Sequence, residues 1–151
     1  MSGDVRLRAV EDADLEVFFE QEQDEVASER ANFPSRPRER FMKHWRTKVV
    51  GDPGVLVRTV LADGDVAGNI VSWTETDGRR FIGYWLGRDH WGKGVGTRAL
   101  TQFLAEEAVR PLYADPHHGN TASVRLLEKV GFRRSGSVFH GGEEHLLLVL
   151  G

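Results

Sequence analysis

Apolar residues along the chain follow two periods, and each period predicts its own kind of element. Residues 5–9 (VRLRA) alternate between apolar and charged positions, as a strand with one buried face does. Apolar side chains three and four positions apart, from Leu15 to Phe19 and again from Phe41 to Val49, predict two helices. A proline-containing break at residues 31–37 (ANFPSRP) separates them. The N-terminal part therefore predicts a strand followed by two helices.

Three segments rich in β-branched and aromatic residues follow. They are residues 55–62 (VLVRTVLA), 66–75 (VAGNIVSWTE) and 79–87 (RRFIGYWLG). The segments ADGD and TDG separate them, and Asp-Gly pairs favour tight hairpins. This pattern predicts a three-stranded antiparallel meander that leads directly into a glycine-rich loop.

Helical and extended patterns alternate after the loop. Residues 100–108 carry an apolar helical stripe, and residues 112–115 (LYAD) predict a short strand. Residues 120–130 predict another helix, which Gly131 ends. Residues 132–150 predict a closing hairpin.

These elements together predict an α/β fold (α+β) with a mixed, mostly antiparallel sheet and about four flanking helices. The chain has no internal repeat, low-complexity tract or linker. Residues 1–151 are therefore predicted to form a single domain.

Composition and charge exclude several classes of protein. A formal charge of −3 argues against a general binder of nucleic acid or of anionic membranes. The N-terminus has no apolar signal segment, and the longest apolar run, Leu146–Leu150, is too short to span a bilayer. Without cysteine there is no disulfide, thiolate nucleophile or cysteine-ligated metal site. We expect a cytoplasmic protein that needs no metal.

The glycine-rich loop predicts an anion site. Residues 87–93 read G-x-x-x-x-G-K, the start of a phosphate-binding loop, but position 94 is Gly where such a loop has Ser or Thr to ligate Mg²⁺. Free amides and the helix dipole still favour an anion at a strand–loop–helix junction. Three ligands compete: Mg²⁺–ATP, a dinucleotide and the pyrophosphate of coenzyme A. Hairpins before the loop weaken the second, which needs a βαβ unit, and Gly94 weakens the first.

Two segments carry a resemblance to a known family. Residues 82–100 (IGYWLGRDHWGKGVGTRAL) and 120–132 (NTASVRLLEKVGF) resemble the Gcn5-related N-acetyltransferase (GNAT) superfamily. They are most similar to the branch of ribosomal-protein N-terminal acetyltransferases, and the order of elements agrees over nearly the whole chain. The resemblance implies a layered fold whose central sheet splays at the cofactor cleft. It also implies acetyl-CoA as co-substrate and no metal.

The resemblance further implies a set of cofactor-binding residues. The strand edge that would pair with pantetheine is formed by Tyr84, Trp85 and Leu86. The loop and helix start that would hold the pyrophosphate are formed by Trp91, Gly92, Lys93, Gly94, Val95, Gly96 and Thr97. Trp91 stands where the family usually has Gln or Arg. Asn120 would organise the loop and contact the cofactor, and Ser123 would hydrogen-bond the coenzyme sulfur; both also suit a helix cap.

The implied reaction is direct transfer of acetyl from the thioester to a primary amine. Many members have a tyrosine general acid where this chain has Leu127. Ser123 is therefore the stronger candidate for the catalytic residue. This branch often has a Glu base where this chain has Phe81, so Glu75 becomes the candidate base, directly or through water. His117 and His118 are further candidates. All three bases also suit solvated surface positions.

The acceptor is the least determined part of the prediction. It is the primary amine of a small molecule or a protein N-terminus. The candidates for the wall of its pocket are Phe18, Phe33, Trp45, Trp73 and Trp85. One alternative is a coenzyme A-binding sensor or accessory module that has lost turnover, and another is an ATP-binding protein. The oligomeric state, monomer or homodimer, is left open.

Overall fold

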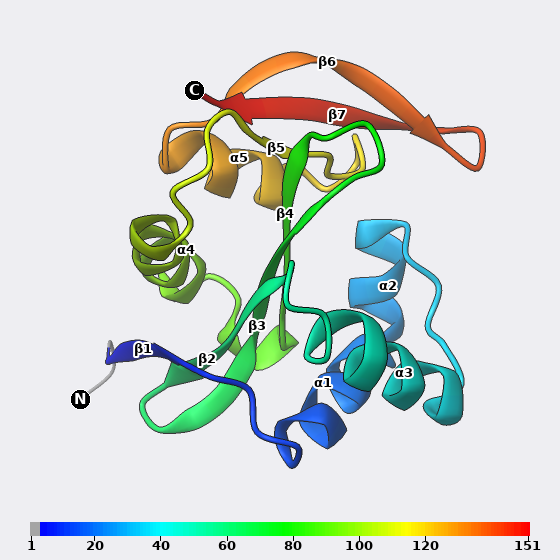
Figure 1. The fold of residues 1–151 in the computed structure, drawn as a ribbon, viewed down its shortest axis with the longest axis vertical. Helices are drawn as coiled ribbons and strands as arrows, with labels where there is room; N and C mark the ends of the chain where they lie inside the picture. The colour runs from blue at the N-terminus through cyan, green and yellow to red at the C-terminus, as the bar shows by residue number, and fades with distance from the viewer. Residues whose placement is uncertain (1–3) are drawn as a thin grey trace.

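A seven-stranded mixed sheet forms the centre of the computed structural model, which describes residues 4–151 (Figure 1). The first three residues of the predicted domain lie outside the described part. The strands are β1 (Val5–Arg8), β2 (Leu56–Ala62), β3 (Asp65–Thr74), β4 (Arg80–Leu86), β5 (Leu112–Ala114), β6 (Arg133–His140) and β7 (Glu143–Leu150). Their order is β1-β2-β3-β4-β5-β7-β6, and only the β4–β5 pair is parallel. The predicted mixed, mostly antiparallel sheet is confirmed.

Helices cover both faces of the sheet. They are α1 (Asp14–Glu22), α2 (Glu25–Ala31), α3 (Arg38–His44), α4 (Val95–Glu106) and α5 (Thr121–Lys129). A π-helical turn, Trp45–Val49, extends α3, and a 3-10 turn, Arg88–His90, precedes α4. In Figure 1, α1, α2 and α3 lie on one side of the sheet, and α4 and α5 lie on the other.

Helix α2 is the element that the hydrophobic pattern does not predict, so there are five α-helices where about four are expected. It buries only Ala27 and therefore has no apolar stripe. A local cap starts it instead, because the Asp24 carboxylate accepts a hydrogen bond from the Val26 N–H (3.0 Å). Asn32, in the left-handed region at φ 52°, ends it.

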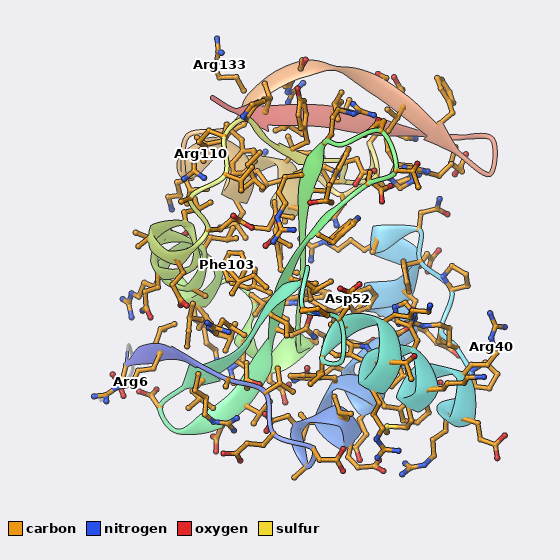
Figure 2. The ribbon with its side chains drawn as sticks, in the orientation of Figure 1. Arg6, Arg40, Asp52, Phe103, Arg110 and Arg133 are labelled. Atoms are coloured by element: carbon orange, nitrogen blue, oxygen red, sulfur yellow. The ribbon has the colours of Figure 1, made fainter. Side chains whose placement is uncertain are left out.

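Two apolar clusters hold these layers together. One joins the sheet to α4 and α5, and its centre includes Phe103, which extends from α4 toward the sheet and is fully buried (Figure 2). The other joins α1 and α3 to the opposite face, where the rings of Phe18 and Trp45 lie 5.0 Å apart. Helices α1, α3, α4 and α5 are thus each fixed by one apolar stripe, as the sequence period predicts.

Strands β4 and β5 pair over a very short distance. Only Arg80 with Leu112 and Phe81 with Tyr113 are in register, whereas β4 pairs with β3 as far as Leu86. The β4 edge from residue 82 to residue 86 therefore has no neighbouring strand. The sheet splays at this point, as the family resemblance implies.

A buried carboxylate holds the closed end of the splay. Glu107, at the end of α4, accepts hydrogen bonds from Ser72 Oγ (2.5 Å), Arg80 Nε (2.8 Å) and the Val109 N–H (3.2 Å). Burial acts to raise the pKa of Glu107, but the hydrogen bonds from Ser72 and Arg80 outweigh it and hold the pKa below its usual value. The carboxylate is therefore ionised in the folded protein, and it links α4 to β3 and β4.

We expect Glu107→Gln to lower the free energy of unfolding at pH 7 by about 3 kcal/mol, because Arg80 is left buried without its counter-charge. The folded pKa of Glu107 lies below the unfolded one, so its stabilisation is present above about pH 4.5 and is lost as the pH falls. The difference between parent and variant should therefore shrink in acid. Urea unfolding at pH 7 and pH 4 measures it.

The neighbouring Glu106 supplies the control. It pairs with Arg58 and its side chain is 39% exposed, so Glu106→Gln should cost no more than about 1 kcal/mol. Equal losses for the two variants would show that the buried network contributes nothing special.

Candidate active site

The unpaired edge of β4 forms one wall of a cleft of about 460 Å³. The beginnings of α4 and α5 and one face of α2 form the other walls. Its lining includes all but one of the predicted cofactor-binding residues: Tyr84, Trp85, Leu86, Trp91, Gly92, Gly94, Val95, Gly96, Thr97, Asn120 and Ser123. Lys93, the remaining one, lies in the same loop but is not part of the lining. The fold thus brings together segments that are far apart in sequence.

The glycine loop presents free backbone donors to this cleft. Gly92 and Gly94 both have positive φ (71° and 77°), which glycine adopts without strain. Gly94 caps the twelve-residue helix α4, and the first helical hydrogen bond runs from the Arg98 N–H to the Gly94 carbonyl (3.2 Å). The N–H groups of residues 95–97 precede that bond and have no carbonyl partner within the helix. This arrangement suits a phosphate or pyrophosphate.

Gly96 has a packing role in addition to the cofactor-binding role that the sequence predicts. A Cβ at this position would lie 2.8 Å from Leu126 Cδ2 and 3.3 Å from Leu86 Cδ1. The missing side chain therefore allows α4 to pack closely against α5 and β4. Gly92 and Gly94 have open space around the same position, so a ligand can approach their backbone.

Trp91 anchors the loop where the family usually has Gln or Arg. Its indole N–H donates to the Leu86 carbonyl (3.0 Å), which closes the loop onto the end of β4. The Arg30 guanidinium lies 4.4 Å from the centre of the Trp91 ring, and its Nε donates to Asn120 Oδ1 (3.2 Å). Arg30 belongs to α2, the helix without an apolar stripe, and for that reason the sequence pattern does not identify it.

Tyr84 and Ser123 face each other across the cleft. The Tyr84 hydroxyl lies 2.5 Å from Ser123 Oγ and 3.2 Å from the Ser123 carbonyl oxygen. Burial raises the pKa of Tyr84 to about 12, against an opposing effect of the Ser123 hydrogen bond. The Ser123 N–H donates to Asn120 Oδ1 (3.3 Å), so Asn120 caps α5 and also binds Arg30.

A second, larger cavity of about 1,020 Å³ lies beside the first. All five predicted wall residues line it: Phe18, Phe33, Trp45, Trp73 and Trp85. The residues that line both cavities are Ala31, Tyr84, Trp85, Asn120 and Ser123. We call this shared region the junction. A group held in one cavity meets a group held in the other at the junction.

The three candidate bases lie in different surroundings. Glu75 is exposed in the turn after β3, accepts a hydrogen bond from Trp73 Nε1 (3.0 Å) and lines neither cavity. His118 is also exposed and lines neither cavity, whereas His117 lines the second one. The catalytic role of Glu75 stays a prediction, and its position offers it no direct path to the junction.

Other kinds of site find no support in the described part of the chain. Among residues 4–151, no group of three or more His, Cys, Asp or Glu side chains is arranged to hold a metal ion. In the same part, no helix has the length and apolar character needed to cross a membrane.

Comparison with known proteins assigns the fold. The family model described as "Acetyltransferase (GNAT) domain" matches residues 4–133. A protein of Bacillus licheniformis, named an uncharacterized N-acetyltransferase p20, is 33% identical over 66 residues, which are 41% of this chain and 37% of that protein. The matched segment thus spans little more than a third of that relative.

Solved structures align over nearly the whole chain. The aminoglycoside acetyltransferase AAC(6′)-Ib in complex with coenzyme A and kanamycin is 25% identical, with a TM-score of 0.80 over 97% of this chain and 94% of that one. An acetyltransferase of the GNAT family from Bacillus anthracis is 21% identical, with a TM-score of 0.79 over 99% and 96% of the two chains.

Gly94→Asp should raise the Kd for coenzyme A at least about tenfold, equivalent to about 1.4 kcal/mol, because a carboxylate would face the bound pyrophosphate. Asp tolerates the left-handed conformation better than most residues, so the variant should fold. Isothermal titration calorimetry measures the affinity.

Gly78→Asp is the matched control. Gly78 has a similar φ of 89° and no neighbour around the added Cβ, but it lies in the β3–β4 turn at the far end of β4. It should bear the same backbone strain and leave the Kd unchanged. An unchanged Kd in folded Gly94→Asp would remove the loop from the cofactor site.

Proposed function

The chain belongs to the acetyltransferase (GNAT) family, and we propose that it is an acetyl-CoA-dependent N-acetyltransferase whose two cavities divide the reaction. The first cavity holds acetyl-CoA, with the pyrophosphate on the amides of residues 95–97 and the pantetheine along the open edge of β4. The second cavity holds the acceptor amine. The observation that carries this proposal is the junction, where Tyr84, Trp85, Asn120 and Ser123 line both cavities.

The unpaired β4 edge explains why the cofactor suits this cleft. Backbone N–H and C=O groups of residues 82–86 lack a partner strand on the β5 side, and buried polar groups without partners cost free energy. Pantetheine carries amides that replace that strand. Its thiol end then lies at the junction, next to Ser123, and the amines of the second cavity can reach the thioester carbon.

Ser123 and Tyr84 assist the leaving sulfur as a pair. A Tyr84 hydroxyl with a pKa of about 12 is too weak an acid to protonate a thiolate, whose conjugate thiol has a pKa of about 8.5. In the proposed relay the Tyr84 hydroxyl donates to Ser123 Oγ, and the serine proton is then free to point at the sulfur. The pair therefore stabilises the thiolate by hydrogen bonding rather than by full proton transfer. In this chain it takes the place of the tyrosine general acid that many family members have where Leu127 stands.

The second cavity favours an acceptor with one amine on an apolar body. Its wall includes seven Phe, Tyr and Trp side chains, and each carboxylate in it already has a partner within the protein. Glu22 accepts two hydrogen bonds from Arg36 (both 3.0 Å), Asp115 Oδ2 lies 2.8 Å from His140 Nε2, and Asp52 accepts from the Gly54 N–H (2.8 Å). A polycation would need several free carboxylates. A small monoamine needs only the junction and the aromatic wall.

We treat residues 1–151 as a single catalytic domain, and we keep the cytoplasm as its proposed location. Membership of the ribosomal-protein N-terminal acetyltransferase branch also stays a prediction, and a peptide N-terminus is the second candidate acceptor.

Ser123→Ala and Tyr84→Phe should each lower kcat by about 10- to 100-fold, because each removes one hydrogen bond from the relay to the sulfur. The Kd for coenzyme A should change little, since the phosphate contacts are intact. The double variant should lose little more than either single one, because the two hydroxyls act as a unit. Steady-state kinetics and thermal melting on the same preparations decide this. If kcat survives within twofold while stability falls, both hydroxyls are merely structural.

Phenylethylamine should be acetylated with a kcat/KM at least about tenfold higher than that of spermidine or kanamycin, since burying extra ammonium groups without free carboxylates costs free energy. Release of coenzyme A thiol in the presence of each amine measures the rate. A phenylalanine-initiated peptide tests the N-terminal alternative. A preference for the polyamines would contradict the proposed acceptor. Tight binding of acetyl-CoA with no acceptor-dependent release would instead favour the sensor.

A further inference from the structure

One buried imidazole in the acceptor cavity has no role in the mechanism described so far. His145 lies in β7 with only 8% of its surface exposed, and it lines the second cavity. The sequence draws attention to the adjacent pair His117 and His118 instead. His145 stands in the run HLLLVL, which reads as an ordinary apolar strand.

The surroundings of His145 determine which of its nitrogens carries the proton. Its Nδ1 lies 2.8 Å from the backbone carbonyl oxygen of Asp115, and a carbonyl oxygen can only accept. Nδ1 therefore carries the hydrogen, and the neutral ring has its lone pair on Nε2. Asn32 Nδ2 lies 3.5 Å from Nε2, which is the outer limit of a hydrogen bond. That lone pair is accordingly available.

The other imidazoles of the cavity are less suitable as bases. His117 Nδ1 accepts the Gly119 N–H (3.1 Å) and its Nε2 lies 3.3 Å from Glu143 Oε1, so both nitrogens are engaged. His140 holds Asp115 through Nε2, and its side chain is 54% exposed. Burial lowers the pKa of His44, and the positive charges of Arg36 and Lys48 lower it further. The same charges would repel an ammonium group from His44.

His145 is linked to the junction through two intermediate residues. Its backbone forms a β-bridge with His117, whose carbonyl accepts the Asn120 N–H (2.9 Å). On the other side, Asn32 follows Ala31, and Ala31 lines both cavities. His145 therefore lies one contact away from junction residues on two sides.

We propose that His145 is the general base of the reaction, and this proposal rests on the proposed function of the second cavity. Nε2 removes one proton from the acceptor ammonium, directly or through one water molecule. The freed lone pair of the amine forms the C–N bond, and the C–S bond breaks with its electron pair on the coenzyme sulfur. The second proton of the nitrogen neutralises that thiolate, and the proton on His145 returns to solvent.

The charged groups around His145 have to be counted in any pH profile. The rings of His140 and His117 have their centres 4.6 and 5.3 Å from the His145 ring. Asp115 bonds to His140 and Glu143 bonds to His117, so each neighbouring imidazole has a carboxylate partner. From α2, the group that faces the ring is the neutral Asn32 amide, and the Glu22–Arg36 pair lines the same cavity.

His145→Asn is the sharpest test. The Asn amide can still donate to the Asp115 carbonyl, as Nδ1 does, but it has no basic nitrogen. With phenylethylamine at pH 7, kcat/KM should fall about 100-fold, the lower range for general base catalysis. The defect should become small near pH 10, and with aniline, which is neutral at pH 7, because no ammonium proton then has to be removed before the nitrogen attacks. A defect that arises from altered structure would persist under both conditions.

The control is His118→Asn, which makes the same exchange at an exposed imidazole that lines neither cavity and should keep kcat/KM within about threefold of the parent enzyme, well short of a general-base loss. If His145→Asn fails to fold, the tautomer of His145 in the parent protein can be read by ¹⁵N NMR. A proton on Nε2 of the neutral ring would overturn the proposal. So would a folded His145→Asn that keeps kcat/KM within twofold at pH 7. Failure of the proposed function can be told apart from failure of the His145 proposal, because the parent enzyme itself would then release no thiol in response to an amine.

Discussion

The two-residue pairing of β4 with β5 is the constraint on which the rest of the structure depends. Arg80 and Phe81 hold the two strands together, and beyond them no inter-strand bond connects the pair. A sheet that parts in its middle loses ladder hydrogen bonds and exposes polar backbone. The fold tolerates this loss because β3 and β7 continue the ladder on the outer sides of the two strands. The opening between β4 and β5 is therefore a stable, wedge-shaped gap in an otherwise continuous sheet.

The hydrogen bonds of Glu107 to its neighbours, which we call the clamp, determine where the opening between β4 and β5 begins. The carboxylate connects the end of α4 with Ser72 on β3 and Arg80 on β4, the strands on one side of the opening. The same helix begins at Gly94, beside the other end of β4. One helix thus spans the wedge from its closed end to its anion-binding end, so the distance between clamp and phosphate site is fixed by the length of α4. Small displacements of the helix would move both together.

The sequence predicts the elements whose stability is local or periodic. The apolar stripes and the Asp-Gly hairpins identify nearly every strand and helix, and three glycines identify the loop. The hydrophobic pattern does not predict helix α2, because a cap at Asp24 rather than an apolar stripe starts it. For the same reason the pattern does not identify Arg30. The pairing of Tyr84 with Ser123 joins residues that are 39 positions apart, so no spacing rule could give it. The buried surroundings of His145 likewise depend on a carbonyl 30 positions away.

Aromatic placement has a consequence for the spectroscopy of this protein. The chain contains four tryptophans, and all of them line the two cavities: Trp91 the first, Trp45 and Trp73 the second, and Trp85 both. No indole lies elsewhere in the core to contribute a constant background. The intrinsic tryptophan fluorescence of the unmodified protein therefore comes entirely from the walls of its two cavities. Arg30, stacked on Trp91 at 4.4 Å, makes the emission of that ring sensitive to any displacement of α2. Occupation of either cavity can be followed without a label.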